Sequence, residues 1–193
     1  MRELMCLYPG AVPAEFVDYV NGLAEKIAPQ DGVLGESTEK GRVDLQYRKS
    51  EIRWLPIEIQ QHFTIVDSLW YYARQANRNL FGFDVDYIQD IQHTTYKADV
   101  NGNGKYDWHH DTFWAGPNAY DRKISITIQL SDPSEYEGGH FEIDPQYQQP
   151  DPELLRQKGT VLVFPSFLRH RVTPVTKGVR KSLVSWVEGP KFR

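Results

Sequence analysis

The chain has 193 residues, of which 40% are hydrophobic and 25% charged, a make-up that indicates a globular protein and excludes a disordered chain. Its formal net charge of −4 does not supply the positive field that non-specific nucleic-acid binding needs, so no nucleic-acid partner is expected. The single cysteine, Cys6, excludes an intrachain disulfide framework and multi-cysteine zinc sites, and it favours a reducing compartment such as the cytoplasm.

The N-terminal third has the apolar periodicity of helices. From Phe16 to Ile27 apolar residues recur at helical spacing, which predicts a helix with Pro13 at its first position and Pro29 as its end. Residues 30–41 are rich in Gly and Glu and predict a loop.

A second helix is predicted after a short strand at residues 51–55. An apolar stripe with helical period runs from Ile59 to Ala73, so this helix should begin after Pro56 and end near Asn77. The sequence contains no apolar run of about 18 residues, the length of a membrane span, so no membrane-spanning segment is expected.

From residue 83 onward the apolar period changes to two, the period of strands. The segment from Ile124 to Leu130 alternates, and further short strands are predicted at 139–143, 159–164, 169–173 and 181–187. Such a series indicates a barrel, sandwich or jelly roll. We therefore predict a mainly β chain with N-terminal helices, in which residues 1–193 form a single domain with a helical support region at 1–82 and a jelly-roll core at 83–193.

Two histidines and one aspartate have the spacing of metal ligands. On a strand, residues i and i+2 point to the same face, so His109 and Asp111 should point together and His110 away from them. His170 lies far enough downstream for roughly four short strands to intervene, and it can supply a third ligand. Two His and one carboxylate leave three positions open on a non-haem Fe(II), although zinc hydrolases can use the same ligands.

Arg180 separates the two possibilities. It follows His170 across a Val-Thr-Pro-Val-Thr-Lys-Gly segment that predicts a hairpin, so it is expected on the adjacent antiparallel strand. A buried guanidinium can hold a carboxylate through two hydrogen bonds. A ligand that chelates the metal at one end and carries a carboxylate at the other would fit, and 2-oxoglutarate is such a ligand; a zinc hydrolase would not need Arg180 at that spacing.

Four separated elements, in this order, resemble the 2-oxoglutarate/Fe(II) dioxygenases of the prolyl 4-hydroxylase type. They are an aromatic lead into the first ligands, the His-x-Asp pair, the distal His in a Phe-Pro-Ser…His segment, and the following Arg. The resemblance covers about residues 83 to 188, and its most specific runs are Tyr96…Gly104-x-Tyr106-x-x-His109-x-Asp111 and the segment from His170 to Trp186.

The resemblance implies a double-stranded β-helix, or jelly roll, whose major sheet is backed by two or more α-helices. It implies that His109, Asp111 and His170 bind Fe(II). The implied reaction consumes 2-oxoglutarate and dioxygen, with ascorbate as an additional reductant, and hydroxylates a prolyl residue of a peptide or protein.

The resemblance also assigns residues around the metal. Arg180 would receive the distal carboxylate of 2-oxoglutarate, and Tyr96 would line the cosubstrate pocket. Tyr106 and Trp186 would line the pocket near the substrate, with packing in the core as the alternative for Trp186. Other functions stay open: hydroxylation of a free amino acid or other small molecule, and a cupin-like metal-binding protein without turnover.

Three further patterns have an ordinary interpretation. Asp99 to Asp107 resembles the opening of an EF-hand loop, but we interpret it as a polar Asn-Gly turn between strands. The basic pair Arg48-Lys49 predicts a solvated face. His140, in a Gly-Gly-His turn, is expected to face solvent, with a role near the substrate as the alternative.

Overall fold

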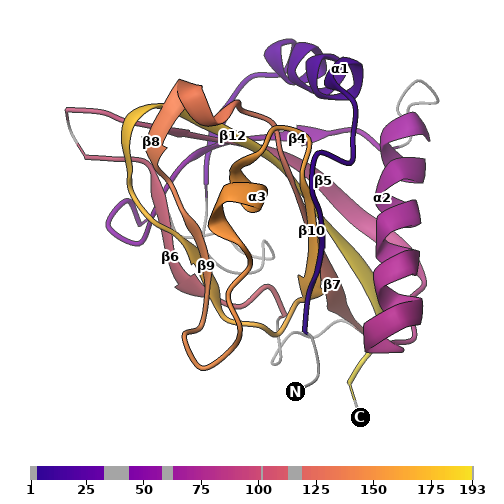
Figure 1. The fold of residues 1–193 in the computed structure, drawn as a ribbon. Coiled ribbons are helices and arrows are strands. Elements are labelled where there is room, and N and C mark those ends of the chain that lie inside the picture. Colours follow the sequence, from indigo (N-terminus) through magenta and orange to yellow (C-terminus); the bar gives the residue numbers. More distant parts are fainter. Residues whose placement is uncertain (1–3, 33–43, 58–62, 101, 113–118, 193) are drawn as a thin grey trace.

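Two antiparallel sheets face each other, and helices cover the outer side of the larger one (Figure 1). The computed structural model describes residues 4–32, 44–57, 63–100, 102–112 and 119–192. In spatial order, the larger sheet contains β1 (Cys6–Tyr8), β10 (Val161–Pro165), β7 (Tyr120–Gln129), β12 (Val175–Pro190), β5 (Tyr87–Lys97), β4 (Glu51–Leu55) and β2 (Gln30–Asp31), with β8 (Tyr136–Gly138) paired to β12. The smaller sheet contains β3 (Arg48–Lys49), β6 (Lys105–His109), β11 (His170–Val172) and β9 (Phe141–Ile143). The predicted mainly β jelly roll backed by helices is confirmed.

Two longer helices occur where the sequence predicts them, although their ends differ. Pro13 is the N-cap of the first helix rather than its first helical residue, because its ψ of 162° is extended. That helix ends before Pro29, because the amides of Lys26 and Ile27 already donate to carbonyls three residues back. Ile59 lies outside the described residues. The helices are α1 (Ala14–Glu25), α2 (Phe63–Ala76), the π-helical turn η2 (Asn77–Phe81), the 3₁₀ turn η3 (Pro133–Glu135) and α3 (Pro152–Arg156).

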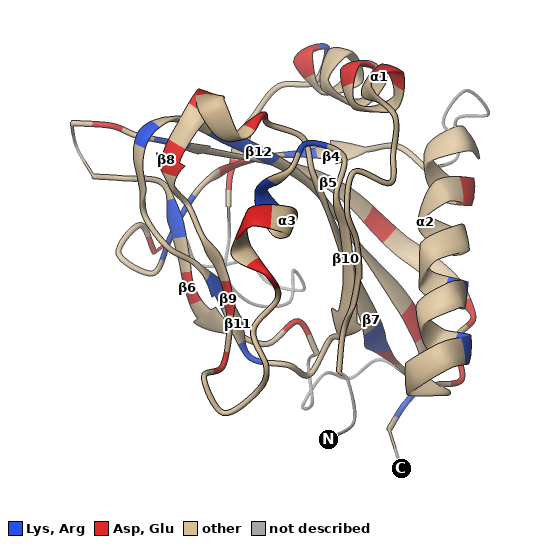
Figure 2. Ribbon diagram, viewed as in Figure 1, with Lys and Arg blue, Asp and Glu red and all other residues tan. Residues whose placement is uncertain are grey.

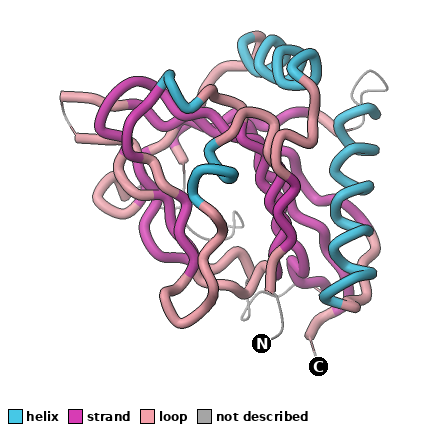
Figure 3. The backbone as a smooth tube through the Cα atoms, in the orientation of Figure 1, coloured by secondary structure: helices cyan, strands magenta, loops and turns pink. Residues whose placement is uncertain are grey.

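The main hydrophobic core lies between the larger sheet and helices α1 and α2 (Figure 3). Val17 and Leu69 from the helices pack with Ile126 of β7 and Leu183 of β12, and all four are fully buried. The alternating strand β7 turns its isoleucines toward this core, so its polar residues, such as Ser125, face the space between the two sheets. The fold thus places polar side chains inside the jelly roll, where a site can form.

Acidic and basic residues are interspersed over the helices and strands (Figure 2). No helix within the described ranges is long and apolar enough to cross a membrane.

The predicted hairpin between His170 and Arg180 is wrong. Strand β11, which begins at His170, belongs to the smaller sheet, whereas β12, which carries Arg180, pairs with β5 and β7 in the larger one. The chain crosses between sheets at Thr173 and Pro174, because Pro174 has no amide to continue a ladder and the next amide, of Val175, donates to the carbonyl of Gly104 instead. His170 and Arg180 therefore stand on opposite walls of the jelly roll.

Candidate metal centre and its pocket

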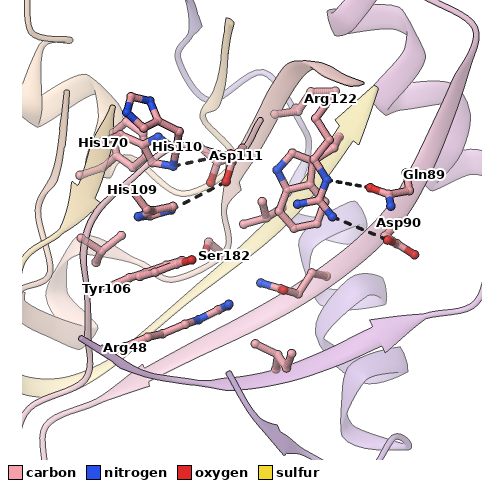
Figure 4. Close-up of a pocket in the computed structure, with 18 of the residues that line it drawn as sticks. Arg48, Gln89, Asp90, Tyr106, His109, His110, Asp111, Arg122, His170 and Ser182 are labelled. Atoms are coloured by element: carbon pink, nitrogen blue, oxygen red, sulfur yellow. Dashed lines mark hydrogen bonds and ion pairs between the residues drawn. The ribbon is translucent and has the colours of Figure 1, made fainter. Parts of the chain in front are cut away.

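A pocket of about 700 Å³ lies between the two sheets. Its walls come from both sheets, so residues far apart in the sequence meet there (Figure 4). All the predicted site residues line it: Tyr96, Tyr106, His109, Asp111, His170, Arg180 and Trp186. His140 is exposed and is not among the lining residues.

Three of these side chains form a compact group of potential metal ligands. His109 and His170 are cross-strand neighbours on β6 and β11, and Asp111 follows the end of β6. The Asp111 carboxylate oxygens lie 3.8 Å from His109 Nε2 and 3.6 Å from His170 Nε2, and the three ligand atoms all lie within 4.8 Å of one another. In the described parts of the chain this is the only such group of His, Cys, Asp or Glu.

Backbone carbonyls fix the two imidazole tautomers. His109 Nδ1 donates to the carbonyl of Asp107 at 2.7 Å, and His170 Nδ1 donates to the carbonyl of Leu168 at 2.9 Å. Both rings therefore present the lone pair of Nε2 to the pocket, as ligating histidines do. Burial, and then the neighbouring His170, lower the pKa of His109 to about 3, so its ring is neutral at pH 7.

Asp111 is held in place as an ionised carboxylate. Burial alone would raise its pKa, but the adjacent imidazoles of His170 and His109 and a hydrogen bond from Ser125 hold the pKa below its ordinary value. Ser125 Oγ donates to Asp111 Oδ2 at 2.6 Å and also bonds to the hydroxyl of Ser166. Two imidazoles and one carboxylate, all oriented, fit a divalent cation that keeps open positions.

His110 lies apart from the group, as predicted. It is one of the residues that line the pocket, but its side chain is exposed, and its Nδ1 donates to the carbonyl of Phe167 at 2.7 Å. It is not among the clustered ligand atoms.

A β-bulge in β6 brings Tyr106 to the ligands. His170 pairs with His109 and Val172 with Tyr106, so Asp107 and Trp108 together face one residue of β11. Without the bulge, residues three apart would point to opposite faces. With it, the ring of Tyr106 stacks on that of His109, with centroids 3.5 Å apart.

Arg180 and Tyr96 are cross-strand neighbours on the opposite wall. Arg180 is only 5% exposed, and its guanidinium carbon lies 5.6 Å from the centre of the Tyr96 ring. The structure places no carboxylate of a described residue within ion-pair distance of Arg180. A buried cation that faces a pocket in this way suits an anionic ligand.

Trp186 is both buried and part of the pocket wall, at 6% exposed. The guanidinium carbon of Arg122 lies 3.9 Å above its ring, while Arg122 Nε donates to Gln89 at 2.7 Å and Nη2 lies 4.0 Å from Asp90 (Figure 4). The sequence interpretation missed Arg122. By simple alternation it should face the helices together with Ile124, but the register shifts between them.

Arg48 is the second residue that sequence reasoning missed. The prediction of a solvated Arg48-Lys49 pair is wrong for Arg48, which is 7% exposed, lines the pocket and lies 4.4 Å from the centre of the Tyr106 ring. Lys49 does point outward. Its Nζ donates to the carbonyl of Gly102 at 2.6 Å and to Asp99 at 3.2 Å, so an ammonium group already occupies these oxygens of the EF-hand-like loop.

Residues 91–188 match the family model of the 2OG-Fe(II) oxygenase superfamily. A PKHD-type hydroxylase from Synechococcus sp. strain CC9311 is 40% identical over 85 residues, which are 44% of this chain and 37% of that protein. A PKHD-type hydroxylase from Xylella fastidiosa strain Temecula1 is 42% identical over 65 residues, 34% of this chain and 27% of that protein. The matched residues thus span only 37% and 27% of the lengths of these two curated relatives.

Solved structures share the fold over nearly the whole chain. A prolyl-4-hydroxylase from Pseudomonas putida has a TM-score of 0.68 and 18% identity, and the similarity covers 96% of this chain and 92% of that one. A prolyl hydroxylase from Trichoplax adhaerens, solved with a peptide fragment of a hypoxia inducible factor, has a TM-score of 0.70 and 17% identity over 95% of this chain and 82% of that one.

Proposed function

Because the chain belongs to the 2OG-Fe(II) oxygenase superfamily, whose model matches residues 91–188, we propose that it is an Fe(II)- and 2-oxoglutarate-dependent dioxygenase that hydroxylates a prolyl residue of a peptide or protein. The observation that carries the proposal is one pocket with the His109, Asp111 and His170 group on one wall and the buried Arg180 on the other. 2-Oxoglutarate has a chelating end that suits a metal ion held by the three-residue group, and a distal carboxylate that suits Arg180.

In this proposal one wall binds the metal and the other binds the distal carboxylate of 2-oxoglutarate. His109, Asp111 and His170 hold Fe(II) and leave adjacent positions for the keto acid and dioxygen. When bound, the iron supplies the dioxygen activation that couples decarboxylation of 2-oxoglutarate to hydroxylation of a C–H bond. Arg180 clamps the distal carboxylate beside the ring of Tyr96.

The substrate binds against Tyr106 and Trp186, which line the same pocket as the metal group. Their rings orient a pyrrolidine and exclude water from the reacting atoms. The names of two structural neighbours support a prolyl substrate: one is a prolyl-4-hydroxylase, and the other is a prolyl hydroxylase in complex with a peptide fragment.

One feature favours a second candidate function. Asp90, Arg122 and Glu188 line the same end of the pocket and carry both signs of charge, as the two ends of a free amino acid do. Hydroxylation of a free amino acid is therefore the alternative.

Three further parts of the proposal rest on the sequence. Residues 83–193 act as the catalytic core and residues 1–82 as its support, within one domain. The protein works in the cytoplasm, because a single cysteine suits a reducing compartment. Ascorbate serves as an additional reductant.

Succinate release tests the function. The Fe(II)-loaded protein is incubated with 2-oxoglutarate and either proline-containing peptides or free amino acids, and products are weighed for the gain of one oxygen atom. Peptide-dependent succinate with an oxidised prolyl residue is expected, and His170→Ala should abolish both. Oxidation of free amino acids alone would select the second candidate, and no turnover with any substrate would leave a cupin-like binding protein.

A further inference from the structure

The side chain of Arg180 passes against a glycine turn. Gly138, the last residue of β8, and Gly139, which follows it, have φ of 72° and 60°, in the left-handed region. A Cβ on Gly139 would lie 3.0 Å from Arg180 Cδ and 2.8 Å from Val175 Cγ2, closer than ordinary contact in both cases. The stem of Arg180 therefore runs through space that only a glycine leaves open.

The turn stands behind Arg180 as seen from the pocket. Arg180 lines the pocket, whereas Gly139 and Val175 are not among the described residues that line it. The turn is tied in place, because the amide of Gly139 donates to the carbonyl of Pro174 at 3.0 Å and Arg156 Nη1 donates to the carbonyl of Gly138 at 3.1 Å. A side chain added at Gly139 would consequently push the stem of Arg180 toward the pocket and the metal group.

The geometry points to Gly139 as a positioning residue that sets how far the Arg180 guanidinium projects toward the metal group, and thereby selects the five-carbon keto diacid over the four-carbon one. This inference rests on the proposed function, because it assumes that Arg180 and the metal group hold the two ends of one ligand. The length of that ligand is then the quantity that Gly139 controls.

Calorimetric titration of the Fe(II)-loaded protein without oxygen tests this, with 2-oxoglutarate, its four-carbon analogue oxaloacetate, and 2-oxobutyrate, which lacks the distal carboxylate. In Gly139→Ala the dissociation constant for 2-oxoglutarate should rise about tenfold or more relative to that for oxaloacetate. Binding of 2-oxobutyrate should not change, because it does not use Arg180.

Gly82→Ala is the matched control. Gly82 has φ of 67°, and a Cβ there would meet nothing within 4 Å, so the substitution brings the same backbone strain without a new contact. It should leave the ratio of the two dissociation constants as in the wild type. Where Gly139→Ala alone does not fold, the Gly139→Ala/Val175→Ala pair removes the closer of the two clashes and allows the same comparison.

The outcomes separate the two hypotheses. If the wild type binds 2-oxoglutarate but Gly139→Ala has the wild-type ratio, the role of Gly139 is wrong and the proposed function stands. If the wild type does not bind 2-oxoglutarate, the proposed function is wrong. The same follows if the Arg180→Ala variant binds 2-oxoglutarate as tightly as the wild type does.

Discussion

Replacing Arg180 by alanine should weaken 2-oxoglutarate binding without affecting the metal. The guanidinium is 5% exposed, so the distal carboxylate would be left in a buried place without its partner. Removing one member of a buried ion pair costs about 3–5 kcal/mol, and each ~1.4 kcal/mol is a factor of ten in affinity. Because the pocket of about 700 Å³ can admit water in place of the guanidinium, we expect the lower end, a loss of roughly a hundredfold.

The assay is an anaerobic titration of 2-oxoglutarate into the Fe(II)-loaded protein, with iron affinity measured in parallel. Lys181→Ala is the matched control, since Lys181 is the next residue on β12 but lines a separate cavity on the other face of the sheet, with Arg53 and His93. A dissociation constant that stays the same in Arg180→Ala, or rises equally in Lys181→Ala, would refute the assignment of the clamp.

Three further outcomes are expected. His170→Ala should abolish Fe(II) binding by elemental analysis, whereas His110→Ala should retain the metal; equal loss would contradict the ligand assignment. Trp186→Ala should destabilise by about 3–5 kcal/mol and lower the hydroxylated product formed per succinate, while Trp186→Phe should restore most of the stability; early melting with an unchanged product ratio would make Trp186 a core residue only. Burial, and then Arg53 and Lys181, lower the pKa of His93 to about 4. Only the unfolded chain therefore takes up this proton between pH 6.5 and 4, and the free energy of unfolding should fall by about 3 kcal/mol as the pH drops through that window. His93→Gln should flatten this dependence in urea titrations, and an equally steep dependence would count against it.

Local patterns predicted the helices and strands well, because burial of one face makes apolar residues recur at the period of the element. The helical stripe of α2 and the alternation of β7 reflect packing against one core, so the period identifies each element. The strand with which a given strand pairs could not be predicted in the same way. The segment after His170 reads as a hairpin, and no residue in it shows that the chain crosses from the smaller to the larger sheet, since that depends on distant residues such as Gly104.

The grouping of His109 and Asp111 was predictable because their i, i+2 spacing is local. Arg122 was not, because a register shift beside it breaks the alternation on which the interpretation depended. Arg48 was not, because a basic pair on a short edge strand looks the same whether it faces water or a pocket. Tyr106 came from family resemblance alone, and simple alternation would have placed its ring on the wrong face.

Because His170 and Arg180 lie on opposite sheets, the packing of the interior sets the distance that a ligand held by both walls must span. Facing sheets lie about 10 Å apart, a spacing set by the side chains between and behind them rather than by the backbone of either strand. A keto acid held at both ends would cross-link the sandwich and raise its melting temperature, by an amount that grows with the logarithm of ligand concentration above the dissociation constant. Substitutions that thin the core, such as Ile128→Ala on the helix side of β7, should then change 2-oxoglutarate affinity from a distance, while iron affinity, which the proposed ligands in the smaller sheet and its adjoining loop would set, stays the same.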